Sequence, residues 1–181
     1  MKNKISLIDP SMIGDILNDL VVQGWRPVMI GGLALVILGS ERVTRDVDFV
    51  IKNPRHRIDE FVKTFYKKGF VLASQINDRG QIIKTFKTKQ EAIHHLKINK
   101  PTSAFFYNSK TGLKIDLLFD FPISASKLLK EAIKLKIDSK TFWIASPTHL
   151  FQLKQLAVTS RGDSRDKQDL EFLKKLLKNN N

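Results

Sequence analysis

The chain has 181 residues, 42% of them hydrophobic, which is enough for one domain with a sizeable core. It contains no cysteine, so disulfides and zinc sites built on thiolates are excluded. Lysine and arginine outnumber aspartate and glutamate by 31 to 18, giving a formal net charge of +13. That charge favours partners that are polyanions, such as nucleic acids or nucleotides.

Neither the N-terminus nor the longest apolar run suggests secretion or membrane insertion. Residues 1–4 are polar and basic apart from Met1, unlike the apolar stretch of a signal peptide. The apolar run 27–39 is shorter than the ~20 residues that a membrane helix needs, and it contains a double glycine. We therefore expect a soluble, cytoplasmic protein that does not use a membrane.

The chain begins with a predicted amphipathic helix, 11–23, whose apolar residues recur at helical spacing. A buried strand, 25–30, follows and ends at Gly31 and Gly32, and the apolar segment 33–38 is typical of a buried helix. A glycine turn that leads from a strand into a helix can let a triphosphate approach the backbone N–H groups. We therefore assign Gly31 and Gly32 to nucleotide binding.

Two aspartates then interrupt an otherwise apolar predicted strand, 46–51. Because strand side chains alternate between faces, Asp46 and Asp48 project from the same face. Two carboxylates on one face repel each other, and a divalent cation relieves that repulsion. The pattern predicts a site for a metal-bound nucleotide.

The rest of the chain mixes predicted strands and helices. In order, these are a helix at 57–67, strands at 70–73, 81–86, 104–107 and 113–119, a short helix at 126–131, a hairpin of strands at 133–137 and 140–144, and helices at 147–159 and 163–178. The lysine-rich segment 84–100 has no clear assignment. The best seam lies near Ser146, so we expect a core, 1–145, and a C-terminal helical segment, 146–181, packed on it as one compact unit.

A single aspartate, Asp116, interrupts the apolar strand 113–119, where a carboxylate is costly to bury unless it is paired or bound to a cation. If the two strands are neighbours, a triad of Asp46, Asp48 and Asp116 can hold two Mg²⁺ or Mn²⁺ ions roughly 3.5–4 Å apart for an in-line phosphoryl displacement. Asp116 can also accept the proton of an acceptor hydroxyl. The alternative is a structural role, in which nearby cations such as Arg42, Arg45 and Lys114 pair with the three carboxylates.

Two cations of the first C-terminal helix are further candidates. Lys154 and Arg161 are seven residues apart, so they share one helix face. Lys154 lies beside the packing stripe, from which it can reach into a cleft and hold a β- or γ-phosphate, and Arg161 could do the same near the helix end. The alternative is a snorkelling lysine and a solvated arginine. Arg165 and Asp166 are expected to be structural, as an ion pair that fixes the last helix.

Three segments in this order resemble the DNA polymerase β-like nucleotidyltransferase superfamily. They are Ile30-Gly31-Gly32, Asp46-Val47-Asp48-Phe49 and Ile115-Asp116-Leu117, within residues 25–119. The resemblance implies an α/β (α+β) fold with a mixed central sheet flanked by helices, an NTP substrate, Mg²⁺ dependence, and transfer of a nucleoside monophosphate with release of pyrophosphate. Many members have Gly-Ser in place of the Gly-Gly pair, so backbone donors replace a serine hydroxyl here.

Segments 146–154 and 161–170, with Arg42-Val43-Thr44-Arg45 before the aspartates, resemble the AbiEii-type branch of that superfamily. This branch holds abortive-infection toxins and small uncharacterised relatives. The resemblance implies nucleotide binding by Arg42 and Thr44, a tRNA acceptor as in some of the toxins, and an antitoxin protein as a partner.

Three functions remain open at this point. The first is nucleotidyl transfer to RNA such as tRNA by a toxin or defence effector, which the net charge favours. The second is the same chemistry on an aminoglycoside or lincosamide antibiotic, although a cationic drug would need acidic residues that the sequence offers sparingly. The third is a non-catalytic nucleotide- or RNA-binding module, which the presence of all three carboxylates disfavours.

Overall fold

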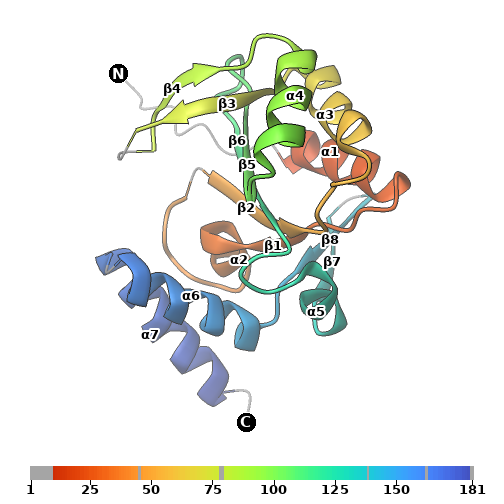
Figure 1. Ribbon diagram of the computed structural model, residues 1–181. Helices are drawn as coiled ribbons and strands as arrows, with labels where there is room; N and C mark the ends of the chain where they lie inside the picture. The colour runs from red at the N-terminus through yellow and green to blue at the C-terminus, as the bar shows by residue number, and fades with distance from the viewer. Residues whose placement is uncertain (1–9, 45, 78–79, 138, 162, 180–181) are drawn as a thin grey trace, which may run out of the picture.

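A computed structural model describes residues 10–44, 46–77, 80–137, 139–161 and 163–179 (Figure 1). Its strands are β1 (Val28–Ile30), β2 (Asp46–Ile51), β3 (Val71–Ile76), β4 (Ile82–Thr85), β5 (Ser103–Tyr107), β6 (Lys114–Phe119), β7 (Ile133–Ile137) and β8 (Lys140–Ile144). Its helices are α1 (Pro10–Val22), α2 (Gly31–Ile37), α3 (Ile58–Lys67), α4 (Lys89–Asn99), α5 (Ala125–Lys130), α6 (Pro147–Arg161) and α7 (Ser164–Asn179).

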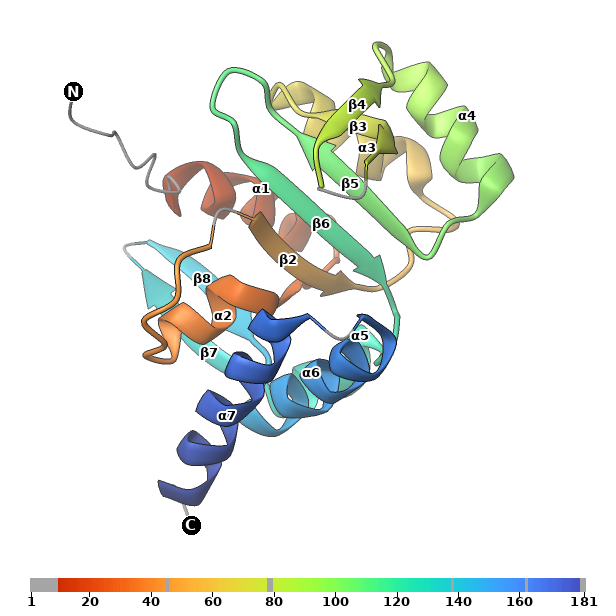
Figure 2. The same ribbon diagram turned by 90° about the vertical axis from the view of Figure 1, so that its left-hand side faces the viewer.

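The strands form one mixed sheet in the order β4-β3-β5-β6-β2-β1-β8-β7. At its centre, β2 runs parallel to β6 and antiparallel to β1, and β1 runs parallel to β8. Helices α1, α3 and α4 lie on one side of the sheet, and α2 and the α6–α7 pair lie on the other (Figures 1 and 2). The predicted α/β fold, a mixed sheet flanked by helices, is confirmed.

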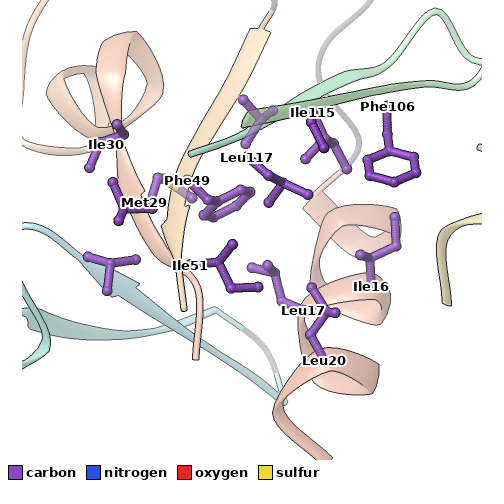
Figure 3. Packing of buried hydrophobic residues seen from close by; sticks show 14 of the residues in the cluster. Ile16, Leu17, Leu20, Met29, Ile30, Phe49, Ile51, Phe106, Ile115 and Leu117 are labelled. Carbon is purple, nitrogen blue, oxygen red and sulfur yellow. The ribbon is translucent and has the colours of Figure 1, made fainter. Parts of the chain in front are cut away.

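The core lies between the sheet and α1 with α3. Alternate residues of β2 and β6, such as Phe49 and Leu117, are buried there, and Leu20 of α1 is one of the side chains that they join (Figure 3). Phe61 of α3 makes edge-on ring contacts with its neighbours, at centroid distances of 5.7 Å to Trp25 and 6.0 Å to Phe106. Alternation leaves the other residues of β2 and β6, the aspartates among them, on the opposite face of the sheet.

Two predicted elements need correction. The first strand begins at Val28 rather than at Trp25, because the Trp25 N–H is donated to the Leu20 carbonyl and Pro27 has no N–H to donate. The unassigned segment 84–100 contains the helix α4. That helix begins with a capping box, in which Thr88 and Glu91 each accept the backbone N–H of the other.

The two C-terminal helices pack on each other and on the rest of the chain. Leu150 of α6 and Leu173 of α7 are buried in the same hydrophobic cluster as the strand side chains. Within the described ranges, no helix combines the length and the apolar character needed to cross a bilayer.

Candidate active site

The turn from β1 into α2 brings the backbone against polar side chains. Gly31 has a φ of +66°, a conformation that favours glycine. A Cβ on Gly31 would overlap with the Asp48 carboxylate, and a Cβ on Gly32 would lie 2.9 Å from the Arg42 guanidinium carbon and from Thr44 Oγ1. Gly31 therefore allows a close approach of the backbone to Asp48, and a larger residue at Gly32 would require the Arg42 and Thr44 side chains to shift.

Asp48 and Asp116 stand opposite each other on neighbouring strands. The parallel register of β2 and β6 pairs Asp48 with Asp116 and Asp46 with Lys114. Because paired positions of neighbouring strands project from the same face, the three aspartates share one face of the sheet. Lys114 Nζ lies 3.9 Å from Asp46 Oδ1, at the margin of this group. The sheet thus brings together carboxylates from two distant segments of the chain.

The surroundings of Asp48 oppose its negative charge. Burial, followed by the neighbouring carboxylates of Asp116 and Asp46, raises the pKa of Asp48 from 3.8 to about 7. Lys154 and Arg42 act in the opposite direction, but they do not compensate. A bound cation would remove this repulsion and favour the ionised carboxylate.

The donor set suits a hard divalent cation, since Mg²⁺ and Mn²⁺ prefer carboxylate oxygens. No group of three or more His, Asp or Glu residues in the described part of the chain is arranged so that it could hold a metal ion. Mg²⁺, however, usually takes one or two carboxylates from a protein and completes its shell with substrate phosphates and waters. The in-register pair Asp48 and Asp116 meets that smaller requirement.

These residues line a cavity of about 620 Å³, whose lining comes from the sheet side and from the C-terminal helices. The polar part of its lining comes from the glycine turn and the three aspartates, together with Arg42 and Thr44. Its apolar part comes from the end of β6, the segment after it and α6, namely Leu118, Phe121, Pro122, Leu153, Leu156 and Ala157. A volume of this size fits a ligand as large as a nucleotide.

A buried ion network forms the far wall of the cavity. Lys154 Nζ lies 2.8 Å from Asp166 Oδ1 and 2.6 Å from Asp169 Oδ2, and Asp169 also pairs with Arg42. The Lys154 and Asp169 side chains are only 12% and 5% exposed. The network therefore connects α6 and α7 to the loop that precedes β2, directly beside the aspartates.

The structure places the other predicted residues as follows. Thr44 lies over Gly32 and donates a long hydrogen bond, 3.4 Å, to the carbonyl of Asp46. The expected ion pair between Arg165 and Asp166 is wrong: Arg165 pairs with Asp163 at 3.1 Å, and Asp166 pairs with Lys154. Asp166 is buried, as its place on the apolar stripe of the last helix suggests. The side chain of Arg161, like Arg45, lies outside the described residues.

Asp169 is the site residue that sequence reasoning missed. It lies three residues after Asp166 and one before Leu170, so both aspartates sit beside the buried stripe of α7. Two acidic residues on the inward face of a helix are a signal for a buried cationic partner. In the structure Lys154 and Arg42 are those partners.

No protein-family model matches the sequence, and no curated protein is significantly similar to it. Solved structures do share its fold. An antigenic nucleotidyltransferase-like protein from Paracoccidioides brasiliensis matches with a TM-score of 0.58 and 16% identity, over 92% of this chain and 75% of that one. The adenylyl-2″-tobramycin complex of ANT(2″)-Ia matches with a TM-score of 0.56 and 12% identity, over 92% and 88%.

Lincomycin-bound LnuA, a lincosamide antibiotic adenylyltransferase, matches with a TM-score of 0.55 and 11% identity, over 92% of this chain and 97% of that one. At these identities the likeness shows the fold. The chain thus has the polymerase β-like nucleotidyltransferase fold that its motifs predicted, while its place in the AbiEii-type branch stays a prediction.

Proposed function

We propose that this protein is a metal-dependent nucleotidyltransferase, which moves a nucleoside monophosphate from an NTP to an acceptor hydroxyl. The observation that carries the proposal is the in-register pair Asp48 and Asp116 beside the Gly31-Gly32 turn. The turn offers backbone N–H groups to a triphosphate, and the carboxylates face the same cavity. The fold shared with known nucleotidyltransferases supports this assignment.

In the proposed reaction, the acceptor oxygen attacks the α-phosphorus, the bond from that phosphorus to the bridging oxygen breaks, and pyrophosphate leaves. Asp116 accepts the proton of the acceptor hydroxyl. Asp48 and Asp116, with Asp46 on the same face, would hold Mg²⁺ or Mn²⁺ together with the substrate phosphates, and two ions are proposed for the loaded site. The metal would neutralise charge on the phosphate oxygens. Asp48 would then stay ionised despite its raised pKa.

Cations and a hydroxyl beside the turn are assigned to the phosphates. Arg42 and Thr44 lie against Gly32, where they can add donors to those of the backbone. Lys154 donates a hydrogen bond to Asp166 and forms an ion pair with Asp169, and its remaining N–H donors can serve a phosphate in the cavity that it lines. Arg161 is also proposed to bind a phosphate, and this proposal rests only on its spacing of seven residues from Lys154 in the sequence.

RNA, such as tRNA, is the proposed acceptor, because a net charge of +13 attracts a polyanion. A toxin or defence effector that acts with an antitoxin is the role that the resemblance to the AbiEii-type branch suggests. The small-molecule alternative has support of its own. The cavity is of a size that suits a small ligand, and two proteins of similar fold are an antibiotic-resistance factor and a lincosamide adenylyltransferase.

The test is incubation of the full chain with Mg²⁺, each α-³²P-labelled NTP in turn and total bacterial RNA. We expect label in RNA with the unmodified protein and with Asp59→Asn, which changes an exposed aspartate that pairs with Lys97 away from the cavity. Asp48→Asn should reduce labelling by about 10³-fold, because the metal contributes several kcal/mol to such transition states.

Other outcomes would assign other functions. Label on added tobramycin or lincomycin, but not on RNA, would favour the antibiotic acceptor. Mg²⁺-dependent NTP binding with no transfer to either acceptor would favour a non-catalytic binding module. Equal labelling by Asp48→Asn and the unmodified protein would show that the site is placed wrongly.

A further inference from the structure

An exposed aromatic ring lines the apolar part of the cavity. Phe121 is 54% exposed, and Leu156, which lines the same cavity from α6, is 51% exposed. Large apolar side chains exposed together in a cavity mark a binding surface more often than chance exposure does. No phosphate or metal needs this part of the wall, so the proposed chemistry leaves it without a ligand.

The backbone next to Phe121 is firmly held. Asp120 has a φ of +53°, which is uncommon for a residue other than glycine. Its carboxylate accepts the N–H groups of Asn53 at 2.9 Å and Ala125 at 3.0 Å, and its own N–H is donated to the Ile51 carbonyl. The exposed ring is therefore presented from a fixed position, and a conformation of this kind is typical of functional sites.

Strand register places Phe121 at the opposite end of the site from the glycine turn. Ile30 pairs with Asp48 in an antiparallel register, so the residues after Ile30 lie toward the start of β2. Phe119 at the end of β6 pairs with Ile51 at the end of β2, and Phe121 follows. The Asp48–Asp116 pair lies between the two ends.

This order has a consequence for an in-line displacement, in which the acceptor enters opposite the leaving group. If the triphosphate lies at the glycine turn, pyrophosphate leaves toward that turn. The acceptor then approaches from the end of β6, past Phe121. The apolar part of the cavity is thus on the acceptor side of the reacting phosphorus.

We propose that the ring of Phe121, in the cavity that Leu156 also lines, stacks against the terminal nucleobase of a single-stranded RNA acceptor. The inference rests on the proposed nucleotidyl transfer and names the part of the acceptor that the site recognises. Stacking on an aromatic ring is the usual way in which a protein holds an unpaired base. Arg165 also lines this cavity, and its side chain is 76% exposed, within reach of a backbone phosphate.

A polycationic acceptor fits this wall less well. The acidic residues near it, Asp163 and Asp166, form ion pairs with Arg165 and Lys154. A cationic drug would have to displace those partners, whereas an apolar base would only cover exposed carbon. The exposed carbon of this wall therefore favours an unpaired base over a cationic group.

The test compares two short single-stranded RNAs, of about ten nucleotides, that carry a 5′ fluorophore. One ends in a normal 3′ nucleotide and the other in an abasic 3′ nucleotide. Binding to the full chain is followed by fluorescence anisotropy in Mg²⁺ with a non-hydrolysable NTP analogue. The variants are Phe121→Ala, Phe121→Trp and the control Ile98→Ala, which removes a side chain that is 61% exposed on α4 and outside the cavity.

We expect the unmodified protein, Phe121→Trp and Ile98→Ala to bind the normal end about tenfold more tightly than the abasic end. Phe121→Ala should bind both RNAs equally, and its affinity for NTP, measured by calorimetry, should be unchanged. If transfer is found, its KM for RNA should rise while kcat stays constant.

Two results would overturn the proposal. One is no preference for the normal end in the unmodified protein, or the same preference in Phe121→Ala. The other is weaker binding of NTP, but not of RNA, by Phe121→Ala, which would assign the ring to the base of the NTP. Failure of the proposed function would be a different result. The binding assay would show a base preference that depends on Phe121, and the labelling assay would show no transfer of nucleotide.

Discussion

The two walls of the cavity use charge in opposite ways. The strand wall gathers like charges, Asp46, Asp48 and Asp116, and burial together with these neighbouring carboxylates raises the pKa of Asp48 to about 7. The helix wall pairs opposite charges in the network of Lys154 with Asp166 and Asp169. One wall is thus electrostatically strained without a cation, and the other is compensated by its own residues.

This difference separates chemistry from positioning. Repulsion between the carboxylates lowers stability, and that loss is the free energy that a bound cation can recover. A compensated network gains nothing from a cation and instead fixes the distance between α6, α7 and the loop before β2. Neutralising one carboxylate should therefore stabilise the strand wall and destabilise the helix wall.

The apolar backing of the strand wall should give the largest effect. Phe49 lies between Asp48 and Val50 in β2, and its fully buried ring faces the core (Figure 3). Phe49→Ala should reduce the free energy of unfolding by about 3–5 kcal/mol, because it removes apolar contacts and leaves a cavity. Urea denaturation measures this change.

The matched control is Leu118→Ala on β6, a partly exposed residue that lines the cavity side of the same strands. It should cost about 1 kcal/mol, since less of its surface leaves water on folding. Equal costs for the two variants would mean that the strands do not separate a core face from a cavity face.

The helix wall comes second. Asp169→Asn keeps the size of the side chain but removes the charge that Arg42 and Lys154 share. Breaking a buried pair leaves a cation uncompensated, so unfolding should become easier by about 2–3 kcal/mol. Glu171→Gln is the control on the exposed face of α7, where its solvent-screened pair with Lys174 should leave the stability unchanged when it is lost.

An unchanged stability in Asp169→Asn would show that the ion network does not stabilise the fold. The comparison between the two walls would then fail, because both would hold charges that the fold does not need. Urea denaturation at neutral pH, in low and in moderate salt, distinguishes the buried network from screened surface pairs.

The strand wall could be predicted from sequence further than the helix wall could. Alternation in β2 alone puts Asp46 and Asp48 on one face, and β2, β7 and β8 have the predicted bounds. The pairing of Asp48 with Asp116 depends on β6 lying next to β2, which the resemblance supplied and local pattern did not. Local periodicity determines which face a residue occupies, but topology determines which residues meet on it.

The contacts of the helix wall depend on how α6 and α7 cross. Hydrophobic periodicity in the sequence does not predict that crossing. The spacing of Lys154 placed it near a cleft, and it does line the cavity, but its two carboxylate partners come from α7. Helix α4 was obscured for another reason. Its lysine-rich composition gives a weak apolar stripe, and the capping box at Thr88 and Glu91 was the stronger signal.

The smallest expected change in the free energy of unfolding is a gain rather than a loss, and it concerns Asp48. With metal chelated, the folded-state pKa of about 7 lies above the ordinary aspartate pKa of 3.8, so the native state binds more protons between these pH values than the unfolded state does. The contribution of Asp48 to stability is therefore fully present below about pH 4 and is lost as the pH rises through 7. Asp48→Asn has no proton to lose in this range, so its stability lacks this pH dependence.

We therefore expect Asp48→Asn to match the unmodified protein near pH 4 and to be more stable by about 1–2 kcal/mol at pH 8 in EDTA, a shift discounted because the side chain is partly exposed. Mg²⁺ should then reduce that gap, since it binds the ionised carboxylates of the unmodified protein and stabilises the fold by mass action. Thermal unfolding at the two pH values, with and without Mg²⁺, measures both the stability gap between the two proteins and its reduction by Mg²⁺. A less stable Asp48→Asn at pH 8 would mean that Lys154 and Arg42 already compensate this carboxylate, and that the two walls form one continuous network.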